Sequence, residues 1–295
     1  VGLEGVAISE RAYQRARAYG IDRVQGRTLT EGSRGIIGHP DVRRMLMDMK
    51  ARTEAMRALA YFAAAQMDRA HSHADEATRV KSQALVDLLI PIVKGCCTEN
   101  AQGITADGVQ IHGGMGFIEE TGAAQYVRDA RITTIYEGTT GIQANDLIGR
   151  KLIRDDGVTM KALLHTVSAE AQRQVGSGDP VLQALGQSLQ RGLEALSQAT
   201  EWILTRANQS PAATAAGAVP YLKLCGTVLG AWLMNRAAEA AQRQLNDNGQ
   251  DDAFLSAKVI TARHYQYHVL VEANSWRDRV INGAISTLAL QDDQF

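Results

Sequence analysis

The sequence predicts an all-α protein, with one up-down helical bundle followed by a second helical bundle. Aromatic residues make up only 5% of the 295 residues and there are only 5 prolines, a composition that favours helices over a β-sandwich. Apolar residues recur with a helical period along most of the chain. Clusters of glycine, proline, asparagine and aspartate separate these periodic segments and mark where one helix ends and the next begins.

Composition excludes several classes of function. The formal net charge is -1, from 31 basic and 32 acidic residues, so no electrostatic field favours nucleic acid or an anionic membrane as a partner. No apolar run approaches the roughly 18–20 residues of a membrane span. The three cysteines, Cys96, Cys97 and Cys225, lack the spacing of a zinc site or a disulfide framework. We therefore expect no metal and a reducing, cytoplasmic compartment.

The chain opens with a predicted helix from Val1 to about Asp22, followed by a loop over 23–38. Pro40 suits the first position of a helix, and apolar residues then keep a helical period for about eight turns. The abrupt start inside an amphipathic pattern leads us to expect that the sequence is a fragment of a longer protein.

A second long helical region is expected over 75–112. Pro91 removes one internal hydrogen bond there and bends or splits the helix, so we expect two segments in line. A short helix follows over about 121–131, and the residues after it are too few and too isolated to form a strand of a sheet.

The character of the sequence changes at 154–157, which we interpret as a domain boundary. Four helical segments are expected after it, with breaks at 176–180, 210–211 and 246–249. Their apolar faces predict an antiparallel bundle over 158–290 with a packing role.

The loop over 23–38 combines cations with glycines. Arg23, Arg27 and Arg34 lie among four glycines, and such a mixture of charge and exposed backbone amides suits a phosphate-bearing ligand. A solvated basic loop without a ligand is the alternative.

The stretch from Gln110 to Asn145 carries most of the chemical information. Gly113 and Gly114 end the second long helix, either as a simple cap or as a place where a ligand approaches the backbone, and Gln110 lies one turn before them. Glu137 comes just before another helix, which Thr139 or Thr140 is expected to cap. It is either a positioned base or an exposed acid at a helix start.

Four segments of the first 150 residues, in order and spacing, resemble the C-terminal helical domain of the acyl-CoA dehydrogenases. They are Ile-Asp-Arg-Val-Gln-Gly (21–26), Val-Gln-Ile-His-Gly-Gly-Met-Gly-Phe (109–117), Val-Arg-Asp-Ala-Arg-Ile (127–132) and Ile-Tyr-Glu-Gly-Thr-Thr-Gly-Ile-Gln (135–143). The part after residue 157 resembles the extra helical domain of the longer bacterial members, including those similar to methylmercaptopropionyl-CoA dehydrogenase.

The resemblance implies a reaction and its base. Glu137 would remove the α-proton of an acyl-CoA thioester while the β-hydrogen passes as hydride to N5 of FAD, which gives a trans-2-enoyl-CoA. Tyr136, Glu137 and Gly138 would form the substrate-binding turn, with the Glu137 N–H on the thioester oxygen.

The resemblance also implies the FAD contacts and the partners. Arg23 would pair with the pyrophosphate, Thr139 would contact FAD near the catalytic turn, and Gln110, Gly113 and Gly114 would line the adenosine portion of an FAD held mainly by a neighbouring subunit. An electron-transfer flavoprotein is the expected electron acceptor, and a homodimer or higher homo-oligomer is expected.

On this resemblance, residues 1–154 form the catalytic helical domain and 158–290 the extension. The family's N-terminal helical domain and middle β-domain are absent, so the isolated chain is expected to be inactive. Two alternatives stay open: an acyl-CoA oxidase-type flavoenzyme, which would differ in its electron acceptor, and a non-catalytic helical assembly module.

Overall fold

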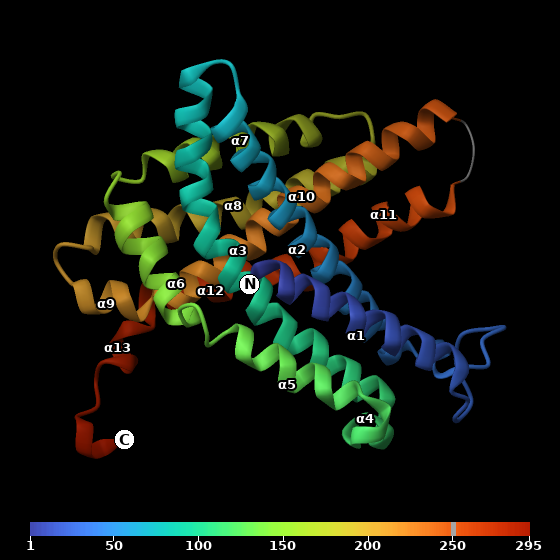
Figure 1. The fold of residues 1–295 in the computed structure, drawn as a ribbon. Coiled ribbons are helices and arrows are strands. Elements are labelled where there is room, and N and C mark those ends of the chain that lie inside the picture. Colours follow the sequence, from blue (N-terminus) through green and yellow to red (C-terminus); the bar gives the residue numbers. More distant parts are fainter. Residues whose placement is uncertain (249–251) are drawn as a thin grey trace.

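The computed structural model describes residues 1–248 and 252–295, and this part of the chain contains helices and no strand, which confirms the predicted fold class. The longer elements are α1 (Gly2–Asp22), α2 (Pro40–Ser72), α3 (Glu76–His112), α5 (Ala123–Thr133), α7 (Val158–Val175), α8 (Pro180–Arg206), α10 (Ala218–Asn248), α11 (Ala253–His264) and α12 (Ala273–Asn282). The shorter ones are α4 (Gly114–Phe117), α6 (Thr140–Asp146), α9 (Pro211–Ala216) and α13 (Ala284–Thr287). Figure 1 shows their arrangement.

The first three helices pack closely along their length. Helix α1 runs in the same direction as α3, because Gly5 near its start lies against the backbone of Cys97, while Tyr19 near its end stacks on His112 with ring centroids 4.4 Å apart. Helix α2 returns antiparallel to α3. Pro40 occupies the first turn of α2, and Asp75 caps α3 by accepting a hydrogen bond from the Thr78 N–H at 2.9 Å.

Helix α3 is unbroken, so the prediction of two segments at Pro91 is wrong. A proline inside a helix loses one backbone hydrogen bond, but Leu89 before Pro91 and Ile92 after it are fully buried in an apolar core that also includes residues of α2 and α10. Tertiary packing of an apolar face supplies most of a helix's stability in a protein, and here it outweighs the local defect.

The breaks predicted after residue 157 match the structure in part. Turns separate α7 from α8 and α8 from α9 as expected, and Gly217 adds a break between α9 and α10. Helix α10 continues through Asn248, beyond the predicted start of the third break, and residue 249 lies outside the described residues.

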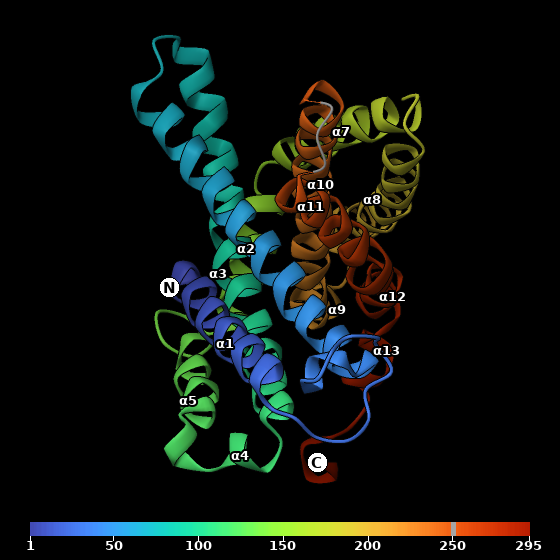
Figure 2. The same cartoon turned by 90° about the vertical axis from the view of Figure 1, so that its right-hand side faces the viewer.

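Residues from both sides of the 154–157 turn contribute to one apolar core. This core includes Leu89 and Ile92 of α3 together with Leu222 and Leu229 of α10, each fully buried. Helices α3 and α10 come close at Gly95, where a Cβ atom would lie 2.6 Å from the Leu222 side chain. Figure 2 shows α10 between the helices of the first half and α7, α8 and α12.

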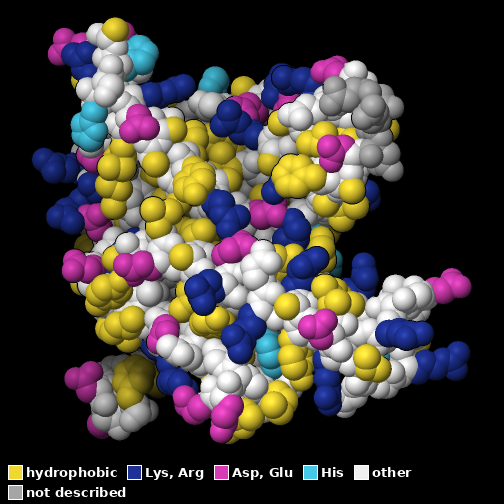
Figure 3. Space-filling view, turned by 45° about the vertical axis from the view of Figure 1, so that its right-hand side comes forward, with side chains coloured by type: hydrophobic (Ala, Val, Ile, Leu, Met, Phe, Trp, Pro, Cys, Tyr) yellow, Lys and Arg dark blue, Asp and Glu magenta, His cyan; other side chains and the backbone are white. Residues whose placement is uncertain are grey.

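The surface carries mixed charges. Figure 3 shows Lys and Arg interspersed with Asp and Glu on the face that it presents, in keeping with the net charge of -1. Among the helices of 1–248 and 252–295, none is long and apolar enough to cross a membrane.

Candidate active site

Glu137 lies in a tight turn between α5 and α6, with an unusual backbone. Its φ angle is 54°, and that of Gly138 is 90°, so two consecutive residues are left-handed. Thr139 caps α6 by accepting a hydrogen bond from the Ile142 N–H at 3.3 Å, which confirms one of the two predicted caps. A left-handed residue other than glycine costs free energy, on the order of 1–3 kcal/mol, and such residues concentrate at functional sites.

Lys94 of α3 binds the carbonyl groups of this turn. This residue is only 9% exposed, and its Nζ donates to the backbone carbonyls of Tyr136 at 2.7 Å and Glu137 at 2.8 Å, and to that of Gly138. An ammonium has three donors, and three carbonyls accept them here. Burial lowers the pKa of Lys94, and the negative charge of Glu137 opposes that shift.

The other side of the turn faces outward. The C=O and N–H of a trans peptide point in opposite directions, so carbonyls bound to Lys94 direct the N–H groups of Glu137, Gly138 and Thr139 away from α3. Within the described part of the chain, no hydrogen-bond acceptor contacts these three N–H groups. The Glu137 side chain is itself exposed on the turn. A carboxylate and free backbone donors are therefore presented together.

The turn is also tied to three other helices. The Tyr136 hydroxyl donates to the carboxylate of Glu4 on α1. At the start of α6, the Thr140 hydroxyl donates to Glu99 of α3 at 2.7 Å, and the second oxygen of Glu99 pairs with Lys223 of α10 at 3.0 Å. The start of α6 is thus linked through Glu99 to the second half of the chain.

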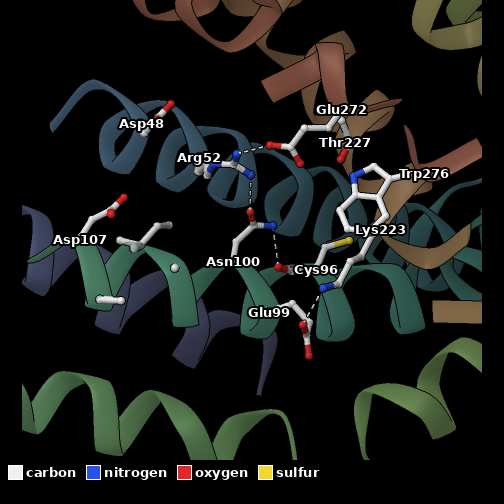
Figure 4. A pocket seen from close by; sticks show the side chains of 13 residues that line it. Asp48, Arg52, Cys96, Glu99, Asn100, Asp107, Lys223, Thr227, Glu272 and Trp276 are labelled. Atoms are coloured by element: carbon white, nitrogen blue, oxygen red, sulfur yellow. Dashed lines mark hydrogen bonds and ion pairs between the residues drawn. The ribbon is translucent and has the colours of Figure 1, made fainter. Parts of the chain in front are cut away.

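The Glu99–Lys223 pair lines a charged cavity of about 390 Å³ between the two halves (Figure 4). Arg52 of α2 crosses this cavity, donating to Asn100 at 3.1 Å and to Glu272 at 2.6 Å. These contacts join α2 to α3 and to the segment between α11 and α12, where Glu272 lies.

The other predicted ligand residues lie at the C-terminal end of α3, whereas the Tyr136–Thr139 turn lies over Lys94 in the middle of this helix. Arg23 follows α1 directly, and Gln110, Gly113 and Gly114 end α3, so the parallel packing of α1 and α3 brings all four to one end of the bundle (Figure 1). From Lys94 to Gln110 along the helix axis is about 24 Å. The structure therefore separates this group from the Tyr136–Thr139 turn.

This second group has the chemistry that an FAD nucleotide needs. Arg23 is an exposed cation, with one hydrogen bond at 3.3 Å to Gln25. Gly113 and Gly114 are exposed, and a Cβ atom on either would meet nothing within 4 Å, so a ligand can approach their backbone. Phosphate oxygens suit the cation, and the adenosine portion suits the open backbone.

The cysteines have no part in either group. All three are buried, and burial raises the pKa of the Cys96 thiol to about 12. Each thiol therefore behaves as a small apolar side chain, as the sequence predicts.

Sequence reasoning missed Lys94. Its only local signal is a single cation in the apolar run from Leu88 to Cys97, where a charge has to find partners once it is buried. Those partners are 42–44 residues away in the sequence, and no local pattern identifies them.

Two family models match the chain. "Acyl-CoA dehydrogenase, C-terminal domain" covers residues 1–153, and "Acetyl-CoA dehydrogenase C-terminal like" covers residues 160–291. The two matches meet near the turn at 154–157, where the sequence changes character.

Two curated relatives match almost the whole chain. A 3-methylmercaptopropionyl-CoA dehydrogenase of Ruegeria pomeroyi is 44% identical over 98% of this chain and 49% of its own length. A broad-specificity linear acyl-CoA dehydrogenase of Mycobacterium tuberculosis is 34% identical over 94% of this chain and 48% of its own length. The chain thus spans about half the length of the curated relatives it matches.

Solved structures show the same fold at lower identity. The ACDH-11 protein of Caenorhabditis elegans in complex with C11-CoA has a TM-score of 0.73 and 17% identity, over 99% of this chain and 46% of that one. An acyl-CoA dehydrogenase of Bacillus anthracis complexed with FAD has a TM-score of 0.71 and 18% identity, over 98% of this chain and 51% of that one. The family model over residues 1–153 and the two curated relatives together show that the chain belongs to the acyl-CoA dehydrogenase family.

Proposed function

We propose that this chain contributes the base and part of the flavin site to an acyl-CoA dehydrogenase that converts an acyl-CoA thioester to a trans-2-enoyl-CoA. The observation that carries the proposal is the turn at Glu137, which presents an exposed carboxylate beside backbone N–H groups that have no acceptor among the described residues. The curated relatives at 44% and 34% identity are both named dehydrogenases, which favours this activity over an oxidase.

The chemistry of the thioester explains why these groups belong together. The α-proton of an acyl thioester is weakly acidic, so a base removes it only if the developing charge on the thioester oxygen is stabilised at the same time. Glu137 acts as the base, and its own N–H donates to the thioester oxygen. FAD, when bound, supplies the acceptor for the β-hydrogen. Tyr136 and Gly138 shape the turn around the substrate.

We assign the two groups of ligand residues to the same cofactor class. Thr139 contacts FAD beside the base, while Arg23 binds a pyrophosphate and Gln110, Gly113 and Gly114 line an adenosine portion. The two groups lie about 24 Å apart along α3. As the family resemblance implies, we assign them to two FAD molecules of a homodimer or larger homo-oligomer. Residues 1–154 act as the catalytic helical domain and 158–290 as an extension that packs on it.

The partners are proposed on the same basis. The substrate is an acyl-CoA, and an electron-transfer flavoprotein accepts the electrons. Three free thiols suit a reducing compartment, so a cytoplasmic location stays a prediction.

Glu137→Gln in the full-length protein tests the function. We expect enoyl-CoA formation and anaerobic bleaching of the flavin by substrate to fall by at least about a thousandfold, while the FAD content stays unchanged. Glu120→Gln, which alters another exposed acid, is the matched control. If Glu137→Gln keeps its turnover, Glu137 is not the base. Stoichiometric peroxide without an electron-transfer partner would identify an oxidase instead.

A further inference from the structure

We propose that Lys94 is the positioning residue of this site, which orients the Tyr136–Gly138 backbone and polarises the Glu137 N–H toward the thioester oxygen. The inference rests on the proposed function, since it gives Lys94 a part in the same reaction. Lys94 itself touches neither substrate nor cofactor and acts through the turn.

The orientation follows from peptide geometry. The carbonyl of Tyr136 and the N–H of Glu137 belong to one planar peptide, so the 2.7 Å hydrogen bond from Lys94 to that carbonyl fixes the N–H on the opposite side. The bond to the Glu137 carbonyl, at 2.8 Å, fixes the next peptide in the same way. One buried ammonium therefore sets the direction of consecutive backbone donors.

The turn needs this support because Glu137 is left-handed without being a glycine. If Lys94 were lost, rotation of the Tyr136–Glu137 peptide would relieve the buried carbonyl, which would no longer have its donor. That rotation would bring a carbonyl oxygen to the side where the thioester oxygen is expected. A donor would be replaced by a repulsive acceptor.

The positive charge of Lys94 also polarises the peptides that its hydrogen bonds orient. A cation on the carbonyl side draws electron density away from the N–H side of each peptide, and hydrogen bonds in such a chain strengthen one another. Lys94 is 9% exposed, so water screens its charge less than that of a lysine on the surface. The Gln143 side-chain amide also donates to the Glu137 carbonyl, at 3.4 Å, but it is neutral and does not replace that charge.

Lys94→Met in the full-length protein tests the proposal with two readouts. Isotope-edited infrared spectroscopy of bound crotonyl-CoA, labelled with carbon-13 at the thioester carbonyl, measures the polarisation of that carbonyl. We expect wild-type protein to lower the carbonyl frequency and Lys94→Met to lose most of that shift. We also expect kcat to fall by about tenfold to a hundredfold with a smaller change in KM.

Hydrogen exchange in the chain itself gives a readout that needs no ligand. The Thr140 N–H is bonded to the Thr134 carbonyl at 3.0 Å across the turn, and its exchange should become at least about tenfold faster in Lys94→Met. Lys81→Met, at an exposed lysine of the same helix, should change none of the three measurements.

The outcomes separate this inference from the proposed function. If Glu137→Gln abolishes turnover but Lys94→Met keeps both the carbonyl shift and kcat, Lys94 is only a satisfied buried cation and the inference is wrong. A wild-type protein without any carbonyl shift also overturns it. Should Lys94→Met fail to fold, Lys94→Gln, which keeps an amide donor but no charge, is measured in the same way. A full carbonyl shift in that variant would again refute the inference.

Discussion

Leu222 lies where α10 crosses α3, and its replacement by alanine tests whether the two halves of the chain unfold together. The side chain is fully buried and covers Gly95, where a Cβ atom would lie 2.6 Å from it. Removing three buried carbon atoms leaves a cavity and should lower the free energy of unfolding by about 2–5 kcal/mol. For a chain of this size that is a fall in Tm of about 5–15 °C.

A second substitution sharpens this prediction. Gly95→Ala alone should destabilise the protein by about 1–3 kcal/mol, because the new methyl group meets Leu222. In the Leu222→Ala background the methyl group enters the cavity, and alanine favours the helix by about 1 kcal/mol relative to glycine. Gly95→Ala should therefore stabilise the protein in that background. The effect of Gly95→Ala is thus expected to change sign.

Urea unfolding followed by circular dichroism measures these free energies, and hydrogen exchange shows which helices they affect. We expect amides of both α3 and α8 to lose protection in Leu222→Ala, since one core includes residues of both helices. The control is Leu29→Ala, at a side chain that is 81% exposed. Two separate transitions, with only residues 158–290 destabilised, would show that the halves are independent and that the reasoning from the shared core fails.

Two further predictions concern titration and thiol chemistry. Hydrogen bonds from the Arg173 guanidinium hold the pKa of Glu239 below its ordinary value of 4.5, so this contact stabilises the fold above pH 4.5 and is lost as the pH falls through the lowered pKa. Glu239→Gln should therefore lower the free energy of unfolding by about 0.5–1 kcal/mol at neutral pH and leave it unchanged in strong acid, as measured by urea unfolding at several pH values. A loss of stability that persists in acid, or a similar pH profile in Glu201→Gln, would contradict this prediction. The three buried thiols, with the pKa of Cys96 raised to about 12, should not react with DTNB at mildly alkaline pH until the protein unfolds, and rapid labelling of the folded protein would disprove their burial.

Local patterns in the sequence predict the helices and the helix start that follows the Glu137 turn. Apolar residues at a helical period mark α1, α2 and α8. The spacing of Thr140 and Gln143 predicts a helix start there, with Thr139 or Thr140 as its cap, and the structure shows that the cap is Thr139. The same local reasoning misjudges Pro91, because the residues that pack around this part of α3 come from distant helices, including α2 and α10, and the sequence beside the proline does not show them.

The parts of the candidate site that the sequence does not predict depend on contacts between residues far apart in the chain. The pattern around Lys94 shows a buried cation but not the three carbonyls that receive it, and the pattern around Glu99 does not show that it meets Thr140 and Lys223. The left-handed conformation of Glu137 is equally hidden, since glutamate has no preference for it. Resemblance to a family makes Glu137 the candidate base, whereas only the fold shows which residues hold its turn.

The shared apolar core bears on how the protein can be divided. If the chain were cut after residue 157, the faces of α2, α3, α6 and the helical segment Leu147–Ile153 that now meet α10 would be left in water. The side chains uncovered would include several that are at most 2% exposed in the intact chain: Leu59, Leu89, Ile92, Leu147 and Leu152. An apolar surface of that extent drives association, so a piece ending there should aggregate or need a chaperone, even though a family boundary falls at the same turn.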